Sequence, residues 1–100
     1  MSVPKIPIPA AKIAEFCQRN QIQQLALFGS ILRDDFQADS DVDVLVEFKP
    51  EAKVGMFALT DMQEELIALF QHPVDLVPKT GLKPVIRESV LNSTLVIYAV

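Results

Sequence analysis

The sequence predicts a single α/β (α+β) domain in which helices pack on a small mixed β-sheet. Half of the 100 residues are hydrophobic and the mean hydropathy is +0.28, which is typical of a folded domain rather than a disordered segment. Segments with helical periodicity and short β-rich segments also follow one another along the chain. Because a chain of this length buries enough surface for one core, we expect one domain over residues 1–100.

Each predicted element rests on a local pattern. Apolar residues spaced three or four apart indicate helices, alternation and β-branched runs indicate strands, and Pro, Gly and Asn mark the ends. In chain order, we predict an extended arm over 1–8, a helix over about 9–20, a strand over 22–28, a short helical turn over 30–34, a strand over 42–48, a helix over 56–70, a strand over 74–77, a helix from about 82 and an edge strand over 95–100.

The start of the helix over 56–70 has two interpretations. Thr60 and Gln63 match a capping box, which favours a later start near Thr60. Phe57 and Leu59 extend the apolar stripe of the helix, and we prefer the longer helix for that reason.

Composition excludes several classes of protein. The net charge of −4 and the pI near 4.8 argue against a protein that holds nucleic acid through phosphate contacts, so we expect no direct nucleic-acid partner. No run approaches the roughly 18 apolar residues of a membrane span. The proline-containing start has no continuous apolar segment and does not resemble a signal peptide. Cys17 is the only cysteine, so no internal disulfide can form, and we expect its side chain in the core. Together, these features predict a cytoplasmic protein without membrane contact.

Acidic residues cluster where the strand over 42–48 begins. Asp41 and Asp43 are two residues apart, so both side chains leave the same face with Cα atoms about 6.5 to 7 Å apart. Two such carboxylates can hold one divalent ion or bridge two ions. Asp75, inside the strand over 74–77, completes this cluster if that strand lies beside the strand over 42–48. Because all three ligands are oxygen atoms, magnesium is the expected metal.

Gly29 and Ser30 follow the strand over 22–28 directly. Glycine after a strand lets the backbone approach a phosphate closely, and the following amides and the Ser30 hydroxyl can donate hydrogen bonds to it. Arg33, one turn further on, adds a positive charge on the same side. These residues predict a phosphate-binding turn beside the carboxylates.

The acidic cluster also has two simpler interpretations. The first is a solvated acidic turn without a ligand. The second is a calcium-binding loop, because Asp39, Asp41 and Asp43 resemble the start of an EF-hand. The calcium loop fails on its own pattern, since Val44 occupies the position that requires glycine and Pro50 occupies that of the closing glutamate.

Other polar residues give weaker signals. His72 precedes a proline and is expected to be a loop residue, whereas Glu47 lies on the same face as Asp43 and is expected at the rim of the site. Lys79, Lys83 and Arg87 either meet a phosphate at the mouth of the site or belong to an exposed face. The sequence does not decide whether Tyr98 packs internally or anchors an interface.

The residues quoted above resemble a known signature. Gly29-Ser30, ten intervening residues and Asp41-Val42-Asp43 are similar to the GS-x10-DxD signature of the polymerase-beta-like nucleotidyltransferase superfamily, and the likeness is greatest to its minimal, MntA-type members. The match extends to Arg33, to Ser40 and to the VDLV stretch around Asp75, and it covers roughly residues 25–77. Asp34 departs from the pattern, since many relatives have glycine there.

The resemblance implies a nucleotidyltransferase fold and a reaction. Asp41 and Asp43 would hold two magnesium ions on the triphosphate of a nucleotide. Asp75 would help bind the metal near the acceptor hydroxyl and assist its deprotonation. Gly29 and Ser30 would bind the β and γ phosphates, and pyrophosphate would leave in line with the attacking hydroxyl oxygen.

The resemblance also implies a partner. Minimal members of the superfamily look like antitoxins that use ATP to adenylylate a tyrosine of a HEPN-type RNase toxin. Two alternatives remain at this point: a non-catalytic antitoxin that acts by occlusion, and a nucleotidyltransferase with a small-molecule or RNA acceptor. The sequence leaves the acceptor, the base preference and the stoichiometry open.

Overall fold

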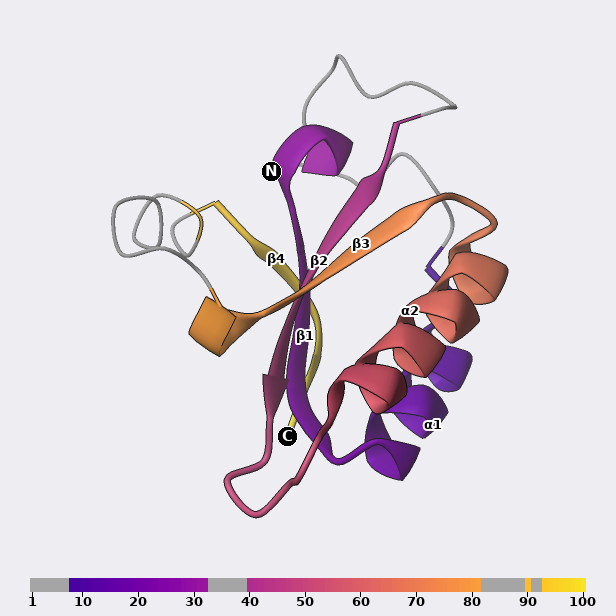
Figure 1. Ribbon diagram of the computed structural model, residues 1–100. Helices are drawn as coiled ribbons and strands as arrows, with labels where there is room; N and C mark the ends of the chain where they lie inside the picture. The colour runs from indigo at the N-terminus through magenta and orange to yellow at the C-terminus, as the bar shows by residue number, and fades with distance from the viewer. Residues whose placement is uncertain (1–7, 33–39, 82–89, 91–92) are drawn as a thin grey trace.

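The computed structural model describes residues 8–32, 40–81, 90 and 93–100. Its elements are α1 (Ala10–Arg19), β1 (Ile22–Phe28), the 3-10 helix η1 (Gly29–Leu32), β2 (Val42–Phe48), α2 (Met56–Phe70), β3 (Val74–Pro78), the 3-10 helix η2 (Lys79–Gly81) and β4 (Leu95–Ala99) (Figure 1).

The predicted elements agree with these bounds to within about one residue at either end, and those over 22–28, 42–48 and 56–70 agree at both ends. The arm predicted over 1–8 (apart from Ile8), the helical turn beyond Leu32 and the helix predicted from about 82 (apart from Val90, which is helical) lie outside the described residues. The prediction of one domain over residues 1–100 stays a prediction. No helix in the described part of the chain is long and apolar enough to span a bilayer.

The four strands form one mixed sheet, as predicted, in the order β3-β2-β1-β4. β1 pairs antiparallel with both β2 and β4, whereas β2 and β3 are parallel. A parallel pair needs a crossover connection, and α2 provides it. The Val42 N–H donates a hydrogen bond to the Pro73 carbonyl over 2.8 Å, so the starts of β2 and β3 are held side by side.

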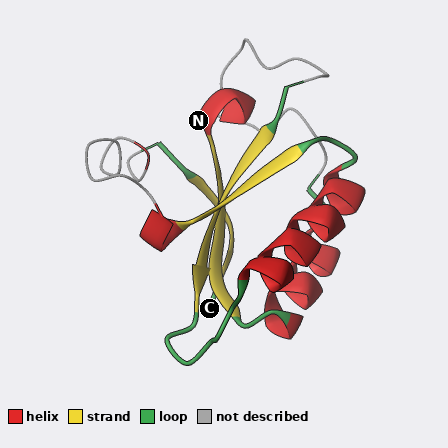
Figure 2. Cartoon of the chain, viewed as in Figure 1, coloured by secondary structure: helices red, strands yellow, loops and turns green. Residues whose placement is uncertain are grey.

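Both long helices cover the same face of the sheet (Figures 1 and 2). Because side chains alternate along a strand, Val42, Val44 and Val46 of β2 are buried towards these helices. The core between helices and sheet also contains Ile13, Phe16, Cys17, Ile22, Leu25, Leu27, Ile31, Met62, Leu66, Phe70, Val74 and Leu76. We call the opposite side of the sheet, which carries Asp43, Leu45 and Glu47 of β2, the far face.

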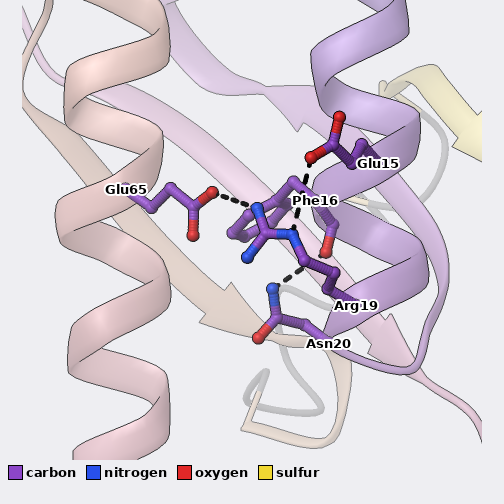
Figure 3. Close-up of polar contacts among 5 residues, drawn as sticks. All are labelled: Glu15, Phe16, Arg19, Asn20 and Glu65. Carbon is purple, nitrogen blue, oxygen red and sulfur yellow. Dashed lines mark hydrogen bonds and ion pairs between the residues drawn. The ribbon is translucent and has the colours of Figure 1, made fainter.

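Polar contacts join α1 and α2 at the carboxyl end of α1 (Figure 3). The Arg19 guanidinium donates a hydrogen bond to the Glu65 carboxylate of α2, and Glu15 lies 4.0 Å from Arg19 on its own helix. The Asn20 side chain donates to the Phe16 carbonyl over 2.8 Å and so satisfies a carbonyl at the helix end. The Arg19–Glu65 contact thus connects the two helices at their exposed edge.

The predicted long helix is confirmed, but one reason for preferring it is wrong. Phe57 does not extend the buried stripe of α2, because 88% of its surface is exposed. Phe57 precedes the buried Leu66 by nine residues, which is two and a half helical turns, so the two side chains leave opposite sides of the helix. Leu59 does pack partly against the core, as expected.

Burial of Cys17 gives a testable chemical property. Its side chain lies in the core, as predicted, and burial raises the pKa of the thiol from 9.0 to about 12. Because the thiolate is the reactive form, iodoacetamide should not modify the folded protein at about pH 8 and should modify it readily in concentrated guanidinium chloride. Intact mass measured over time checks this, and rapid labelling of the folded chain would contradict the burial of Cys17.

Candidate active site

Two of the predicted aspartates lie side by side at the start of the parallel strand pair. Asp43 of β2 is the register partner of Asp75 of β3. Neighbouring strands are about 4.8 Å apart, and register partners project from the same face, here the far face. Asp41 lies two residues before Asp43, just outside the strand. Asp41 and Asp75 are exposed and Asp43 is half-buried, so all three are accessible at one end of the sheet.

Gly29 lies against the Asp43 side chain. It follows Phe28, which pairs with Asp43 across the antiparallel strands β1 and β2. Gly29 has a φ of +79°, a conformation that other residues rarely adopt, and a Cβ at this position would lie 2.2 Å from Asp43 Oδ2. A side chain at position 29 would therefore displace the carboxylate. The sequence indicated a glycine for phosphate approach but not this contact.

The other two predicted phosphate-binding residues are described less fully. The backbone of Ser30 belongs to η1, directly after Gly29, and its side chain lies outside the description. Arg33 lies outside the described residues. Their roles at a phosphate stay predictions.

The donor set fits a magnesium ion that is shared with a substrate. Asp41, Asp43 and Asp75 offer only carboxylate oxygens, the ligands that Mg²⁺ prefers. Among the residues the structure describes, however, no three His, Cys, Asp or Glu side chains are close enough together to hold a metal ion. Magnesium sites commonly combine one or two carboxylates with substrate phosphates, so a complete protein cage is not required. The assignment of these residues as ligands stays a prediction.

Glu47 and Lys79 form a separate polar cluster at the other end of β2. Lys79 Nζ lies 2.8 Å from Glu47 Oε1, and Gln23 donates a hydrogen bond to the other carboxylate oxygen. The hydrogen bond from Lys79 keeps the pKa of Glu47 below its ordinary value. Glu47 follows Asp43 by four residues, or about 13 Å along the strand. Lys79 is therefore at the opposite end from the aspartates, not at the mouth of their site.

Pocket size does not identify a nucleotide site in the described part of the chain. A pocket of about 460 Å³ lies at the carboxyl ends of β2 and β3, where Lys49 and the Lys79–Glu47 pair line it, but it has no pair of carboxylates for a metal. A pocket of about 90 Å³ lies over Ala26 and Leu45. It is smaller than the roughly 300 to 1,000 Å³ of typical ligand sites. The aspartates and Gly29 are therefore the better candidate on chemical grounds.

Residues 10–97 match the nucleotidyltransferase domain family. The chain belongs to this family. It is 36% identical over 81 residues to the protein adenylyltransferase MntA of Thermococcus cleftensis, and this match covers 81% of the chain and 80% of the relative. The resemblance expected from the sequence is thus confirmed, and the chain is a nucleotidyltransferase.

Solved structures show the same fold. A toxin-antitoxin structure with AMP-PNP superposes with a TM-score of 0.74 at 21% identity, over 93% of this chain and 75% of the other. A complex of a tri-AMPylated HEPN toxin from Shewanella oneidensis with its MNT antitoxin gives a TM-score of 0.66 at 22% identity, over 91% and 70% of the two chains. At these identities the likeness concerns the fold alone.

The contact between Gly29 and Asp43 predicts the effect of adding one methyl group. Gly29→Ala should lower nucleotidyl transfer at least tenfold, because the new Cβ must displace the Asp43 carboxylate, and the positive φ should cost about 1 to 2 kcal/mol of unfolding free energy. Pyrophosphate release and chemical denaturation measure the two effects.

Gly55→Ala is the matched control. Gly55 is extended at the N-cap of α2, and a Cβ there meets nothing within 4 Å, so both quantities should stay near wild type. A Gly29→Ala protein as active as the Gly55→Ala protein would contradict the packing of Gly29 against Asp43.

Proposed function

We propose that this chain is a magnesium-dependent adenylyltransferase that transfers AMP from ATP to a tyrosine of a HEPN-type toxin, and that it acts as the antitoxin of that toxin in the cytoplasm. The observation that carries the proposal is the register of β2 and β3, which makes Asp43 and Asp75 neighbours beside Gly29. Paired carboxylates next to a glycine turn suit a metal that is shared with a triphosphate.

The names of the relatives support AMP and a protein acceptor. The Thermococcus relative is a protein adenylyltransferase, and the Shewanella complex contains an AMPylated HEPN toxin with its antitoxin. The AMP-PNP in the toxin-antitoxin structure supports an adenine nucleotide as the substrate. The acidic charge of this chain is unfavourable for an RNA acceptor.

Each predicted site residue then has a role. Asp41 and Asp43 would hold two magnesium ions, and Asp75 would hold one of them and accept or direct the proton of the tyrosine hydroxyl. Gly29 and Ser30 would bind the β and γ phosphates through the backbone and the serine hydroxyl, with Arg33 adding positive charge. The magnesium ions would stabilise the negative charge of the triphosphate while the adenylyl group is transferred. The tyrosine oxygen forms a bond to the α-phosphorus of ATP. The bond between the α-phosphorus and the oxygen that bridges it to the β-phosphorus breaks, and pyrophosphate leaves.

Substitution of Asp43 tests this proposal. Asp43→Asn should reduce AMP transfer by about 100-fold or more, because a charged ligand is lost, while the unfolding free energy stays unchanged or rises slightly as repulsion between carboxylates is relieved. The measurement is the intact mass of a co-encoded HEPN-type protein after incubation with this chain, ATP and magnesium. Glu51→Gln is the control and should transfer as wild type, because Glu51 is an exposed carboxylate beyond the opposite end of β2.

Three outcomes separate the alternatives. A gain of one or more AMP units that requires Asp43 supports protein adenylylation. A stable complex without any mass gain would instead identify an antitoxin that acts by occlusion. Transfer that survives Asp43→Asn would show that the site is assigned wrongly.

A further inference from the structure

The first turn of α2 displays two large apolar side chains to solvent. Met56 and Phe57 are 82% and 88% exposed, although the rest of the helix buries Met62, Leu66 and Phe70 against the sheet. An adjacent exposed pair of this size is typical of an interaction site rather than of a free surface. Neither side chain belongs to the hydrophobic core of the described residues.

Phe57 begins a continuous exposed stripe along α2. Asp61, Glu64 and Ala68 follow it at intervals of four, three and four residues, which places all four side chains on one side of the helix. All are exposed, and this side lies opposite the stripe that packs on the sheet. The outer stripe of α2 is defined here as Met56, Phe57, Thr60, Asp61, Glu64 and Ala68. The stripe is apolar at its start and acidic further along the helix.

The charges of the outer stripe indicate the chemistry of its partner. Every ionisable residue of α2 is acidic, and the helix has no Lys or Arg. Glu65 is already paired with Arg19 of α1, whereas Asp61 and Glu64 are exposed on the outer stripe. A complementary surface would therefore combine an apolar pocket with cationic side chains.

We propose that the outer stripe of α2 is the docking surface for the HEPN-type partner, with Met56 and Phe57 in an apolar pocket and Asp61 and Glu64 facing lysine or arginine side chains. This inference rests on the proposed function, in which a HEPN-type toxin must bind this chain to receive AMP. A second copy of this chain is a poor occupant. A two-fold dimer through the stripe would bring the acidic residues of both copies together.

The apolar start of the outer stripe is separate in space from the proposed chemistry. Asp43 lies at the start of β2, whereas α2 begins beyond the end of β2, and Figure 1 shows these two starts at opposite ends of the molecule. α2 also covers the face of the sheet from which Asp43 points away. Loss of docking should therefore raise the KM for the partner without changing kcat at saturation.

The test measures binding and transfer with the same set of variants. Phe57→Ser and Glu64→Lys should each weaken binding of the co-encoded HEPN-type protein about tenfold or more in calorimetric titration, and raise the KM for it by a similar factor. Val96→Ser, at a half-exposed valine of β4, and Glu51→Lys, with the same charge change, are the matched controls and should bind as wild type. Because Phe57 is exposed, melting temperatures should not change.

The outcomes distinguish this inference from the proposed function. Wild-type affinity of both stripe variants, with transfer intact, would overturn the docking surface and leave the proposed function standing. A wild-type chain that neither binds the partner nor transfers AMP to it would overturn both. Self-association of the chain that is lost with Phe57→Ser would identify a second copy as the occupant and overturn the inference.

Discussion

The parallel pairing of β2 with β3 is the constraint on which the candidate site depends. Val74 and Leu76 are buried towards the helices, so Asp75 between them must point to the far face. A slip of one residue would turn Asp75 towards the core and away from Asp43. The hydrophobic pattern of β3 and the hydrogen bond from Val42 to Pro73 therefore bring two carboxylates together that are 32 residues apart in the chain.

The helix α2 holds that pairing in place. It provides the crossover between the two parallel strands, and its Gln63 side chain accepts a hydrogen bond from the Leu76 N–H of the edge strand over 3.1 Å. Arg19 connects α2 to α1 through Glu65. One side of α2 thus stabilises the position of Asp75, while the outer stripe is left for a partner. The same helix links the proposed chemistry to the proposed recognition.

Local patterns predicted the elements well and contacts between distant residues poorly. The strands over 22–28 and 42–48 were predictable because apolar runs end at Gly29 and Pro50. Strand periodicity predicts a common face for Asp41 and Asp43, which stays a prediction because Asp41 precedes β2, whereas the place of Asp75 required knowing which strand pairs with β2. The contact of Gly29 with Asp43 depends on the antiparallel register of β1 and β2. The contact of Lys79 with Glu47 depends on the pairing of β2 with β3. No local sequence signal therefore indicates either contact. Phe57 was misplaced because apolar character alone does not show which side of a helix meets the core.

We expect Asp43 and Asp75, together with Asp41, to form a metal site that a nucleotide completes. The most direct test is titration with Mn²⁺, a paramagnetic substitute for Mg²⁺, with and without a non-hydrolysable ATP analogue. Such a site predicts weak Mn²⁺ binding to the chain alone, because no three described ligands are close enough together. With the analogue, protein-bound Mn²⁺ should be held at least tenfold more tightly, and Asp43→Asn and Asp75→Asn should abolish this gain. Tight binding without nucleotide, or binding that survives both substitutions, would contradict it.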